Sequence, residues 1–489
     1  MKWLASTLVL LVACGSDSKP APAGDDGDPP PDAPPGVCDG VPEGGACNAA
    51  GTEVTRCADG APMTETCETG CVVVGGVASC GGPAVCDGVG PLGRCEGDVL
   101  RRCDGAPSVV DCAAGGMICG YRDDTAGYAC LASTGAHRVA GTITWEDRPL
   151  SPGMLGAPIT SPARGTMVAV VDDSTNAQLA TVSAADDGTY VAHYAAQSST
   201  RVRVVAYSRS RAELRPARVR DTAGYLHAVG STAFEAGASS SVDIHVTAAS
   251  TAGGAWNALD NAITAMDWLR AHGTTPITPV YIYWQSTTAS GSYYQGGSNA
   301  LHLDGDDGFD DVVALHELGH YVQDEYSDSD NPGGAHDGSP ADPRLAWGEG
   351  GATWFALALR QVPYYIDWSI GGGWSVELEQ RVHAASPSGT MSQNVSEWMV
   401  AEVLWDITDS ATDGADAIDG GAPSVWKVLV GYVISPQRRD RGRAGLDLVE
   451  FLDGWFVEHG MASCSSMRAL LRTQYGFPYD LAGPAGACP

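Results

Sequence analysis

The chain has 489 residues, of which 28 are lysine or arginine and 59 are aspartate or glutamate, so its net charge is −31 at pH 7. This length suffices for about three or four domains. Such an acidic surface repels phosphate backbones, which argues against nucleic acid as a partner. The apolar fraction of 44% can supply a sizeable core, and the 62 glycines and 29 prolines favour many turns over long helices.

The N-terminal residues have the pattern of an export signal. A positively charged start precedes an apolar run over residues 8–12, which is too short to span a bilayer. The run ends in Leu-Val-Ala-Cys at residues 11–14, which resembles a bacterial lipobox. The resemblance implies that residues 1–13 are removed and that Cys14 carries a lipid. The protein would then be an exported lipoprotein, held at the outer membrane or cell surface of a Gram-negative-type bacterium. An ordinary signal peptide cut near the same place is the alternative.

Two cysteine-rich modules follow a short tether. Residues 14–36 have too little apolar area to fold and predict a disordered tether. The triplet Cys-Asp-Gly at Cys38 then recurs 48 residues later at Cys86, and each copy has six cysteines. These are Cys38, Cys47, Cys57, Cys67, Cys71 and Cys80, then Cys86, Cys95, Cys103, Cys112, Cys119 and Cys130. Such short modules need disulfides to fold, and the Cys-x2-Cys pairs that zinc favours are absent from the sequence. If Cys14 carries the lipid, 14 of the 15 cysteines remain for pairing in an oxidising compartment, and the pairing itself stays open.

Residues 137–250 predict an all-β sandwich. Short strands separated by turn signals, without helical periodicity, are typical of that fold. The expected strands cover residues 138–145, 167–171, 188–194, 201–207 and 242–246. Two segments, Val-Ala-Gly-Thr-Ile-Thr from residue 139 and Asp-Gly-Thr-Tyr from residue 187, resemble the transthyretin-like domain found in carboxypeptidases and many secreted proteins. No catalytic constellation is visible in this part of the sequence.

Residues 251–489 predict an α+β domain. Apolar residues from Trp256 to Leu269 recur at three- and four-residue steps, as in an amphipathic helix. Strands are expected over residues 279–284 and 299–303, and a helix over residues 309–326. The sequence therefore predicts two strands followed by a long helix in this part of the domain.

The helix expected over residues 309–326 carries the sequence His-Glu-Leu-Gly-His from His316 to His320. The four-residue spacing places both imidazoles on one helical face, one turn apart, where both can reach one zinc ion. Glu317 is rotated around the same helix and can reach a zinc-bound water as its base. Zinc lowers the pKa of such a water toward about 7. A pair of solvated helical histidines is the alternative.

A third ligand decides the class of zinc site. A metzincin would need Gly at position 323 and His at position 326, where this chain has Gln323 and Tyr326. Residues 347–356, Trp-Gly-Glu-Gly-Gly-Ala-Thr-Trp-Phe-Ala, resemble instead the helix start that carries the glutamate ligand in the aminopeptidase-N and thermolysin families of gluzincins. The resemblance implies that Glu349 is the third ligand and projects from the first turn of an apolar helix.

Two other residues are rivals for a place at the metal. The 28 residues between His320 and Glu349 exceed the spacing of the best-known gluzincins, and the excess resembles an inserted loop over residues 327–344. His336 lies in that loop and is a rival third ligand. Asp324, one turn beyond His320, is a candidate for orienting a ligand imidazole, or it faces solvent.

The same domain contains further residues with a possible functional or structural role. The acidic run at residues 304–311 suits calcium, although a solvated turn that favours the start of the next helix is the alternative. A donor to the transition-state oxyanion is needed besides zinc, and the sequence does not choose among Tyr364, Tyr365 and His383. A largely apolar helix is expected over residues 396–406, and Cys464 and Cys488 are expected to pair.

Together these features predict a multidomain fold: disulfide-rich repeats, an all-β sandwich and an α+β zincin-like catalytic domain. The expected boundaries are 1–13 for the signal, 14–36 for the tether, 37–82 and 83–131 for the modules, 137–250 for the sandwich and 251–489 for the zincin domain. We expect a lipid-anchored zinc metallopeptidase with one zinc ion per chain, acting on proteins or peptides. The alternative is a surface adhesion or binding protein with a structural or inactive zincin domain. Glu317 argues against that alternative, because a structural zinc site needs no base.

Overall fold

The computed structural model describes most of the chain from residue 45 onward. The described residues are 45–48, 53–58, 61–67, 71–74, 77–80, 89–104, 106–123, 127–132, 136–151, 154–210, 215–237, 240–286, 291–369, 372–380, 389–411 and 414–481. The predicted signal and tether, and with them Cys14, lie outside these residues, as do His383 and Cys488. No helix within the described ranges is long and apolar enough to cross a membrane.

Short antiparallel strands and disulfides build both cysteine-rich modules. The first module contains the sheets β1-β2-β3 and β4-β5, and the second contains β6-β7-β8 and β9-β10. Their strands are β1 Ala46–Cys47, β2 Glu53–Ala58, β3 Ala61–Thr66, β4 Cys71–Val74, β5 Val77–Cys80, β6 Arg94–Glu96, β7 Val99–Asp104, β8 Ala106–Asp111, β9 Met117–Asp123 and β10 Gly127–Ala132. The disulfides with both partners described are Cys47–Cys71, Cys95–Cys119 and Cys112–Cys130. The first two join the second and fifth cysteines of their repeats and both span 24 residues, so the predicted disulfides are confirmed and the duplication extends to their pairing.

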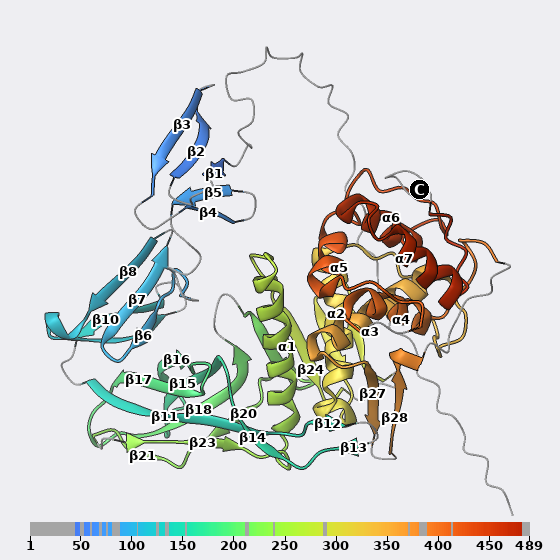
Figure 1. Cartoon of the computed structure of the whole chain (residues 1–489). Coiled ribbons are helices and arrows are strands. Elements are labelled where there is room, and N and C mark those ends of the chain that lie inside the picture. Colours follow the sequence, from blue (N-terminus) through green and yellow to red (C-terminus); the bar gives the residue numbers. More distant parts are fainter. Residues whose placement is uncertain are drawn as a thin grey trace, which may run out of the picture.

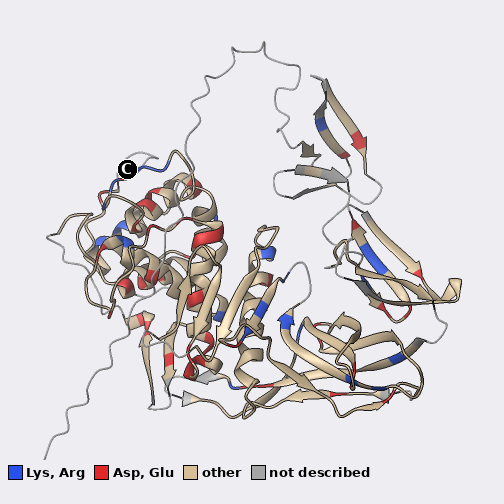
Figure 2. Cartoon of the chain, turned by 180° about the vertical axis from the view of Figure 1, so that it is seen from behind, with Lys and Arg blue, Asp and Glu red and all other residues tan. Residues whose placement is uncertain are grey.

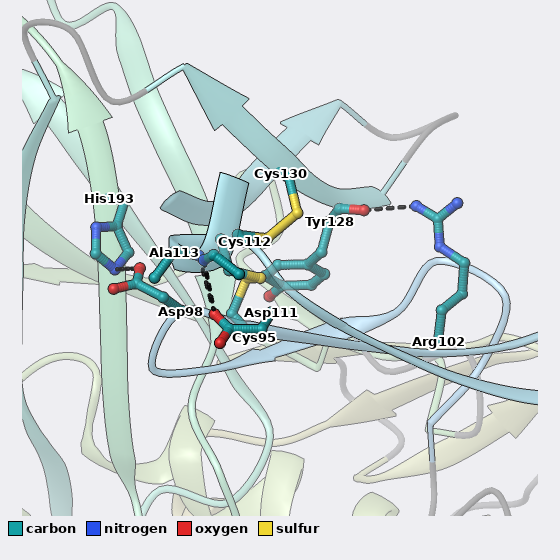
Figure 3. The surroundings of a disulfide bond; sticks show 11 residues. Cys95, Asp98, Arg102, Asp111, Cys112, Ala113, Tyr128, Cys130 and His193 are labelled. Carbon is teal, nitrogen blue, oxygen red and sulfur yellow. Dashed lines mark hydrogen bonds and ion pairs between the residues drawn. A yellow bond between two sulfur atoms is a disulfide. The ribbon is translucent and has the colours of Figure 1, made fainter. Parts of the chain in front are cut away.

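The second module packs against the sandwich. The Tyr128 hydroxyl accepts a hydrogen bond from the backbone N–H of Ser183 (2.9 Å). Figure 3 shows the module around Cys112 and Cys130, with Asp98 facing His193 of the sandwich; Oδ1 of Asp98 lies 3.5 Å from Nε2 of His193. Buried residues of the module belong to the same hydrophobic cluster as the sandwich core. This module is therefore held to the sandwich by packing as well as by chain connectivity.

The region expected to be a sandwich consists of two sheets (Figure 1). One sheet has the order β14-β11-β17, with β22 and β23 pairing in parallel with β11. The second sheet starts with β16-β15-β18-β19, and β20 and β21 pair with β18. The strands, including the separate pair β12 and β13, are β11 Ala136–Asp147, β12 Leu150–Ser151, β13 Met154–Leu155, β14 Ile159–Pro162, β15 Thr166–Asp172, β16 Gln178–Ser183, β17 Thr189–Ala195, β18 Arg201–Ser210, β19 Ala217–Arg220, β20 Ala228–Gly230, β21 Phe234–Glu235, β22 Ser240–Ser241 and β23 Ile244–Val246. All five predicted strands are present in this β-rich part of the fold.

The second sheet continues beyond residue 250 into the C-terminal part. Strand β19 pairs in parallel with β24 (Val280–Trp284), which pairs in parallel with β26 (Ala300–Leu303). The antiparallel strand β25 (Tyr293–Gln295) forms the edge beside β26. Helix α1 (Gly253–Ala271) contacts strands from both sides of residue 250, namely β18, β19 and β24. One nine-stranded sheet thus joins the sandwich to the C-terminal part.

Two arginines of the sandwich bind acidic residues of α1. The guanidinium of Arg164 donates to both carboxylate oxygens of Asp260, at 2.8 and 2.9 Å. Arg215 binds Asp267, two helical turns later, in the same two-point manner, at 2.7 and 2.8 Å. Bidentate pairs of this kind define an orientation as well as a distance. They hold α1 in one position against the sandwich.

The C-terminal part is mainly helical (Figure 1). Helix α2 (Asp311–Tyr326) packs on α3 (Pro343–Arg360), which packs on α4 (Glu397–Thr408). The remaining helices are α5 Gly421–Val430, α6 Leu448–His459 and α7 Cys464–Arg468, which continues as a π-helical turn over Ala469–Gln474. Figure 2 shows many acidic and few basic segments on these helices, in keeping with the net charge. The glycine of the His-Glu-Leu-Gly-His motif allows the close contact of α2 and α3, because a Cβ on Gly319 would lie 2.7 Å from Cα of Ala352.

A two-stranded hairpin, β27 (Tyr364–Ser369) and β28 (Gly372–Glu377), lies beside the start of α2. Asp310 caps α2 by accepting hydrogen bonds from the backbone N–H groups of Val312 and Val313, both at 3.1 Å. Its other oxygen accepts a bond from the backbone N–H of Trp368 (2.7 Å). One carboxylate therefore both starts the motif-bearing helix and fastens the hairpin to it.

Candidate metal site

Helix α2 presents the two motif histidines as its sequence predicts. His316 and His320 are both buried, and their ring centroids lie 4.8 Å apart. The helix extends from residue 311 to residue 326, close to the expected range of 309–326. The two imidazoles are therefore inside the protein, which differs from a pair of solvated helical histidines.

Helix α3 brings Glu349 to both histidines. Its Oε2 atom lies 3.3 Å from Nε2 of His316 and 3.1 Å from Nε2 of His320, and the residue is 1% exposed. Zinc–nitrogen and zinc–carboxylate bonds of about 2.0–2.2 Å in a tetrahedral site place neighbouring donor atoms about 3.3–3.6 Å apart. The separations measured here are close to that range. The three donors fit one zinc ion.

The position of Glu349 within its helix differs from the sequence expectation. Helix α3 begins at Pro343, with Asp342 as its N-cap, so Glu349 lies in the second turn and not in the first. The loop after α2 is accordingly shorter than expected, since residues 343 and 344 are helical. Proline is favoured at the first helical position, where its missing N–H has no intrahelical partner to lose. The apolar segment after Glu349 identified the helix but not where it starts.

Two side chains orient these donors. Nδ1 of His316 is hydrogen-bonded to the hydroxyl of Thr353 (3.1 Å), one turn beyond Glu349 on α3. The amide of Asn331 donates to Oε1 of Glu349 (2.9 Å). Such partners commonly set the ring orientation and the basicity of metal ligands. Neither residue was among the candidates from the sequence. Thr353 could have been found from its position one turn after Glu349 on the same helix. Asn331 has no such signal in the sequence, because its contact with Glu349 arises from the folding of a loop.

His336 lies between two carboxylates. Its Nδ1 is 2.8 Å from Oε2 of Glu397 at the start of α4, and its Nε2 is 3.7 Å from Oε2 of Glu349. The donor atoms of His336, Glu349 and Glu397 lie within 4.8 Å of one another and form a second group that shares Glu349 with the motif histidines. His336 is therefore placed beside the donor set of His316, His320 and Glu349, on the side of Glu349. Nothing in the sequence indicates that Glu397 contacts His336.

The charges of this cluster shift the pKa values of its members. Burial raises the pKa of Glu349, but His320 and His336 outweigh it and hold this pKa well below its usual range. Burial lowers the pKa of His320, but Glu349 outweighs it and the pKa rises. Burial likewise opposes protonation of His336, yet Glu349 and Glu397 raise its pKa to about 9. The carboxylate of Glu349 is thus ionised, which is the state that metal binding requires.

Glu317 is buried next to this cluster, and its negative charge contributes to raising the pKa values of His320 and His336. Burial raises the pKa of Asp307 to about 7, and the negative charge of Glu317 contributes to this shift. The motif glutamate is therefore close enough to act electrostatically on the site. It does not belong to either group of potential metal donors among the described residues.

Tyr364 and Tyr365, the two tyrosine candidates for the donor to the oxyanion, are neighbours on strand β27 but have different surroundings. The Tyr365 ring packs edge-on against His316, with centroids 5.9 Å apart, and also contacts Trp374 and Trp398. Tyr364, the neighbouring residue on the strand, lies by Glu377, which raises its pKa. Of the sequence candidates for a donor to the substrate carbonyl, Tyr365 is the tyrosine beside the site.

The remaining sequence candidates lie apart from the cluster or serve the fold. The carboxylate of Asp324 accepts a hydrogen bond from the Tyr294 hydroxyl of β25 (2.8 Å). In the acidic run at residues 304–311, residues 306–309 form a 3₁₀ turn and Asp310 caps α2. Neither group of potential metal donors in the described ranges includes these aspartates, so calcium there remains a prediction. Cys464 is disulfide-bonded.

Comparison with known proteins agrees with a metallopeptidase-related C-terminal part. Residues 261–437, about a third of the chain, match the family described as the Mycolysin C-terminal domain, a domain found in zinc metallopeptidases. No curated protein matches the chain. A solved structure of a 9R-lipoxygenase from Cyanothece PCC8801 aligns with 29% of this chain and 24% of that chain, at 11% identity and a TM-score of 0.14. A likeness this weak carries no argument about fold or activity.

Proposed function

We propose that this protein is a zinc metallopeptidase whose zinc ion is held by His316, His320 and Glu349. One observation carries the proposal: Oε2 of Glu349 lies within 3.3 Å of Nε2 of both motif histidines, inside the segment that matches a metallopeptidase-associated domain. Three protein donors leave one position of a tetrahedral ion for water or substrate, as in catalytic rather than structural zinc sites. When bound, zinc would lower the pKa of its water to about 7 and polarise the carbonyl of the scissile bond.

The protein's own groups would carry the proton. Glu317 is buried beside the donors without being one of them, and we assign its carboxylate the role of accepting the proton of the attacking water. The same carboxylic acid can then donate that proton to the leaving amine. The substrate carbonyl needs a further hydrogen-bond donor as negative charge develops on its oxygen. We assign this role to His336, which contacts Glu397, or to Tyr365, whose ring packs against His316.

Hydrolysis of an unfolded protein by the purified full chain tests this proposal. The expected result is cleavage that a zinc chelator abolishes and added zinc restores. The matched control is the double variant His316→Ala, His320→Ala, which should not cleave with or without added zinc. Mass spectrometry of peptide-library digests would then define the cleaved bonds. Absence of cleavage by the zinc-loaded wild type, over a broad library, would favour a binding protein with an inactive zincin domain.

We also propose, from the sequence pattern, that the protein is exported and lipid-anchored at Cys14, with the membrane and a protein or peptide substrate as its partners. Partitioning into detergent and mass analysis of the N-terminus test the anchor, with Cys14→Ser as the control that should remain in the aqueous phase. An unmodified N-terminus downstream of Cys14 would contradict it.

A further inference from the structure

We infer that Asn331 is a positioning residue that makes Glu349 a one-oxygen ligand and so keeps the coordination of the metal open. The inference rests on the zinc site proposed above. A carboxylate can bind a metal through one oxygen or through both, and the two modes leave different space for water and substrate. What surrounds the two oxygens of Glu349 therefore bears on whether the site can work as a catalyst.

The two oxygens of Glu349 have different neighbours. Oε2 lies near Nε2 of His316 and of His320, at 3.3 and 3.1 Å. Oε1 instead accepts a hydrogen bond from Nδ2 of Asn331 at 2.9 Å. An amide donor on Oε1 draws that oxygen away from the donor set. Oε2 is left as the atom that faces the metal position.

The orientation of the Asn331 amide is determined by a second contact. Its Oδ1 accepts a hydrogen bond from the backbone N–H of Gly333 (2.9 Å), so the NH2 group must be the end that faces Glu349. The side chain is 6% exposed and lies against the backbone of α3. A Cβ on Gly348 would come within 2.5 Å of Nδ2, so the glycine before the ligand provides the space that the amide occupies.

The loop that carries Asn331 is anchored to the C-terminal helical part. The carboxylate of Asp330 accepts hydrogen bonds from the backbone N–H of Leu446, at 3.0 and 3.1 Å. Asp328 pairs with Arg438 at 2.6 Å. These contacts involve neither the histidines nor Glu349. The amide is thus held in place independently of the metal, which is what a positioning residue requires.

A neutral amide suits this role better than a cationic side chain. It satisfies Oε1 while leaving the negative charge of the carboxylate to the metal, whereas a lysine or arginine would neutralise that charge. With Glu349 bound through one oxygen, the protein supplies three donors and a fourth position stays free. Without the amide, Oε1 can turn toward the metal and raise its coordination number.

The test compares zinc affinity and coordination in full-length variants. Asn331→Ala removes the donor, and the nearly isosteric Asn331→Asp keeps an acceptor for Gly333 but replaces the donor with a negative charge. The matched control is Gln323→Ala, because Gln323 is also 6% exposed and its amide donates to the carbonyl of Gly348 (2.9 Å), beside Glu349 but not to its carboxylate. Affinity is measured by competition with a chromophoric chelator. Coordination is read from the visible spectrum of the cobalt-substituted protein.

We expect both Asn331 variants to bind zinc about 10- to 100-fold more weakly than wild type, the range typical of losing a partner of a metal ligand. The cobalt spectrum of Asn331→Ala should weaken and shift as coordination increases, whereas Gln323→Ala should keep the wild-type spectrum. An Asn331→Asp variant that folds, binds zinc as tightly as wild type and keeps its cobalt spectrum would overturn the inference. Failure of the proposed function would appear differently, as absence of zinc binding or hydrolysis in the wild type itself.

Discussion

Nε2 of His320 and Oε2 of Glu349 lie 3.1 Å apart, although 28 residues separate them in the sequence and they belong to different helices. The contact exists because α2 and α3 pack closely at Gly319. The proposed zinc ion would bind these two atoms together with Nε2 of His316.

Zinc should bind at one ion per chain and stabilise the fold. A ligand present at about 100 times its Kd raises the free energy of unfolding by about 2.7 kcal/mol. Thermal unfolding with and without a chelator should therefore show a clear loss of Tm in wild type. In the Glu349→Gln variant this difference should shrink, because a neutral amide is a poorer ligand for zinc. Metal analysis that finds stoichiometric, tightly bound zinc in His316→Ala, His320→Ala would refute the ligand assignment.

Glu317→Gln should separate catalysis from metal binding. The substitution keeps the size of the side chain and removes its basicity, so hydrolysis should fall by about 10²–10⁴-fold. Zinc content and Tm should change little, because the three donors remain. Glu325→Gln, which makes the same charge change later on α2, serves as the control and should cleave as wild type does. Equal cleavage rates for Glu317→Gln and wild type would rule out this residue as the base.

His336→Ala should lower kcat more than it lowers zinc affinity. Loss of one donor to a developing oxyanion typically costs about 10²–10³-fold in kcat. His336 is placed for such a contact by Glu397, at 2.8 Å, so Glu397→Gln should give a smaller loss in the same direction. A phosphonate transition-state analogue should bind most tightly to wild type, less tightly to Glu397→Gln and most weakly to His336→Ala. If the His336→Ala variant instead loses its zinc, His336 is a ligand, as the rival sequence interpretation holds.

Asp147→Asn should stabilise the protein above neutral pH. Burial, with help from the negative charges of Asp311 and Asp260, raises the pKa of Asp147 to about 6. The folded state therefore holds this proton to a higher pH than the unfolded state does, so stability falls as the pH rises from about 4 to about 6. Because the group is partly exposed, the gain for Asn at pH 8 should be about 1 kcal/mol or less. Denaturant titrations of both proteins at pH 4 and pH 8 measure this difference in the free energy of unfolding. The variant should gain little stability at pH 4. An equal gain at both pH values would show that the pKa of Asp147 is not raised in the folded protein.

A fragment of residues 251–489 should fail to fold on its own. It loses the pairing of β24 with β19 and the bidentate pairs that Arg164 and Arg215 make with α1. A fragment of residues 137–489 retains all of them and should show cooperative thermal unfolding. Circular dichroism of both fragments makes the comparison, and a cooperatively folded 251–489 fragment would show that the shared sheet is dispensable.

Local patterns in the sequence were sufficient for much of this protein. The histidine pair and the short strands between turn signals depend on neighbours within a few residues, where chain geometry dictates which side chains share a face. The duplicated triplet and the repeated cysteines are visible in the sequence because the second module repeats the first. Glu349 could be proposed because residues 347–356 resemble the helix start that carries the glutamate ligand in gluzincins. The start of its helix was misplaced because that end depends on Asp342 and Pro343, which lie outside the apolar pattern.

The residues that surround the donors could be identified only from the packing of distant segments. Asn331, His336 and Glu397 come from a loop and from α4, and no periodic pattern relates such residues to α2. The same holds for the pairing of β19 with β24, since these strands lie on opposite sides of residue 250 and meet by long-range backbone hydrogen bonds. Local spacing thus identified His316 and His320 as possible metal ligands, because both residues lie on one helix. Which side chains hold those ligands in place was decided by loop and helix packing, whose contacts span tens of residues and leave no local signal.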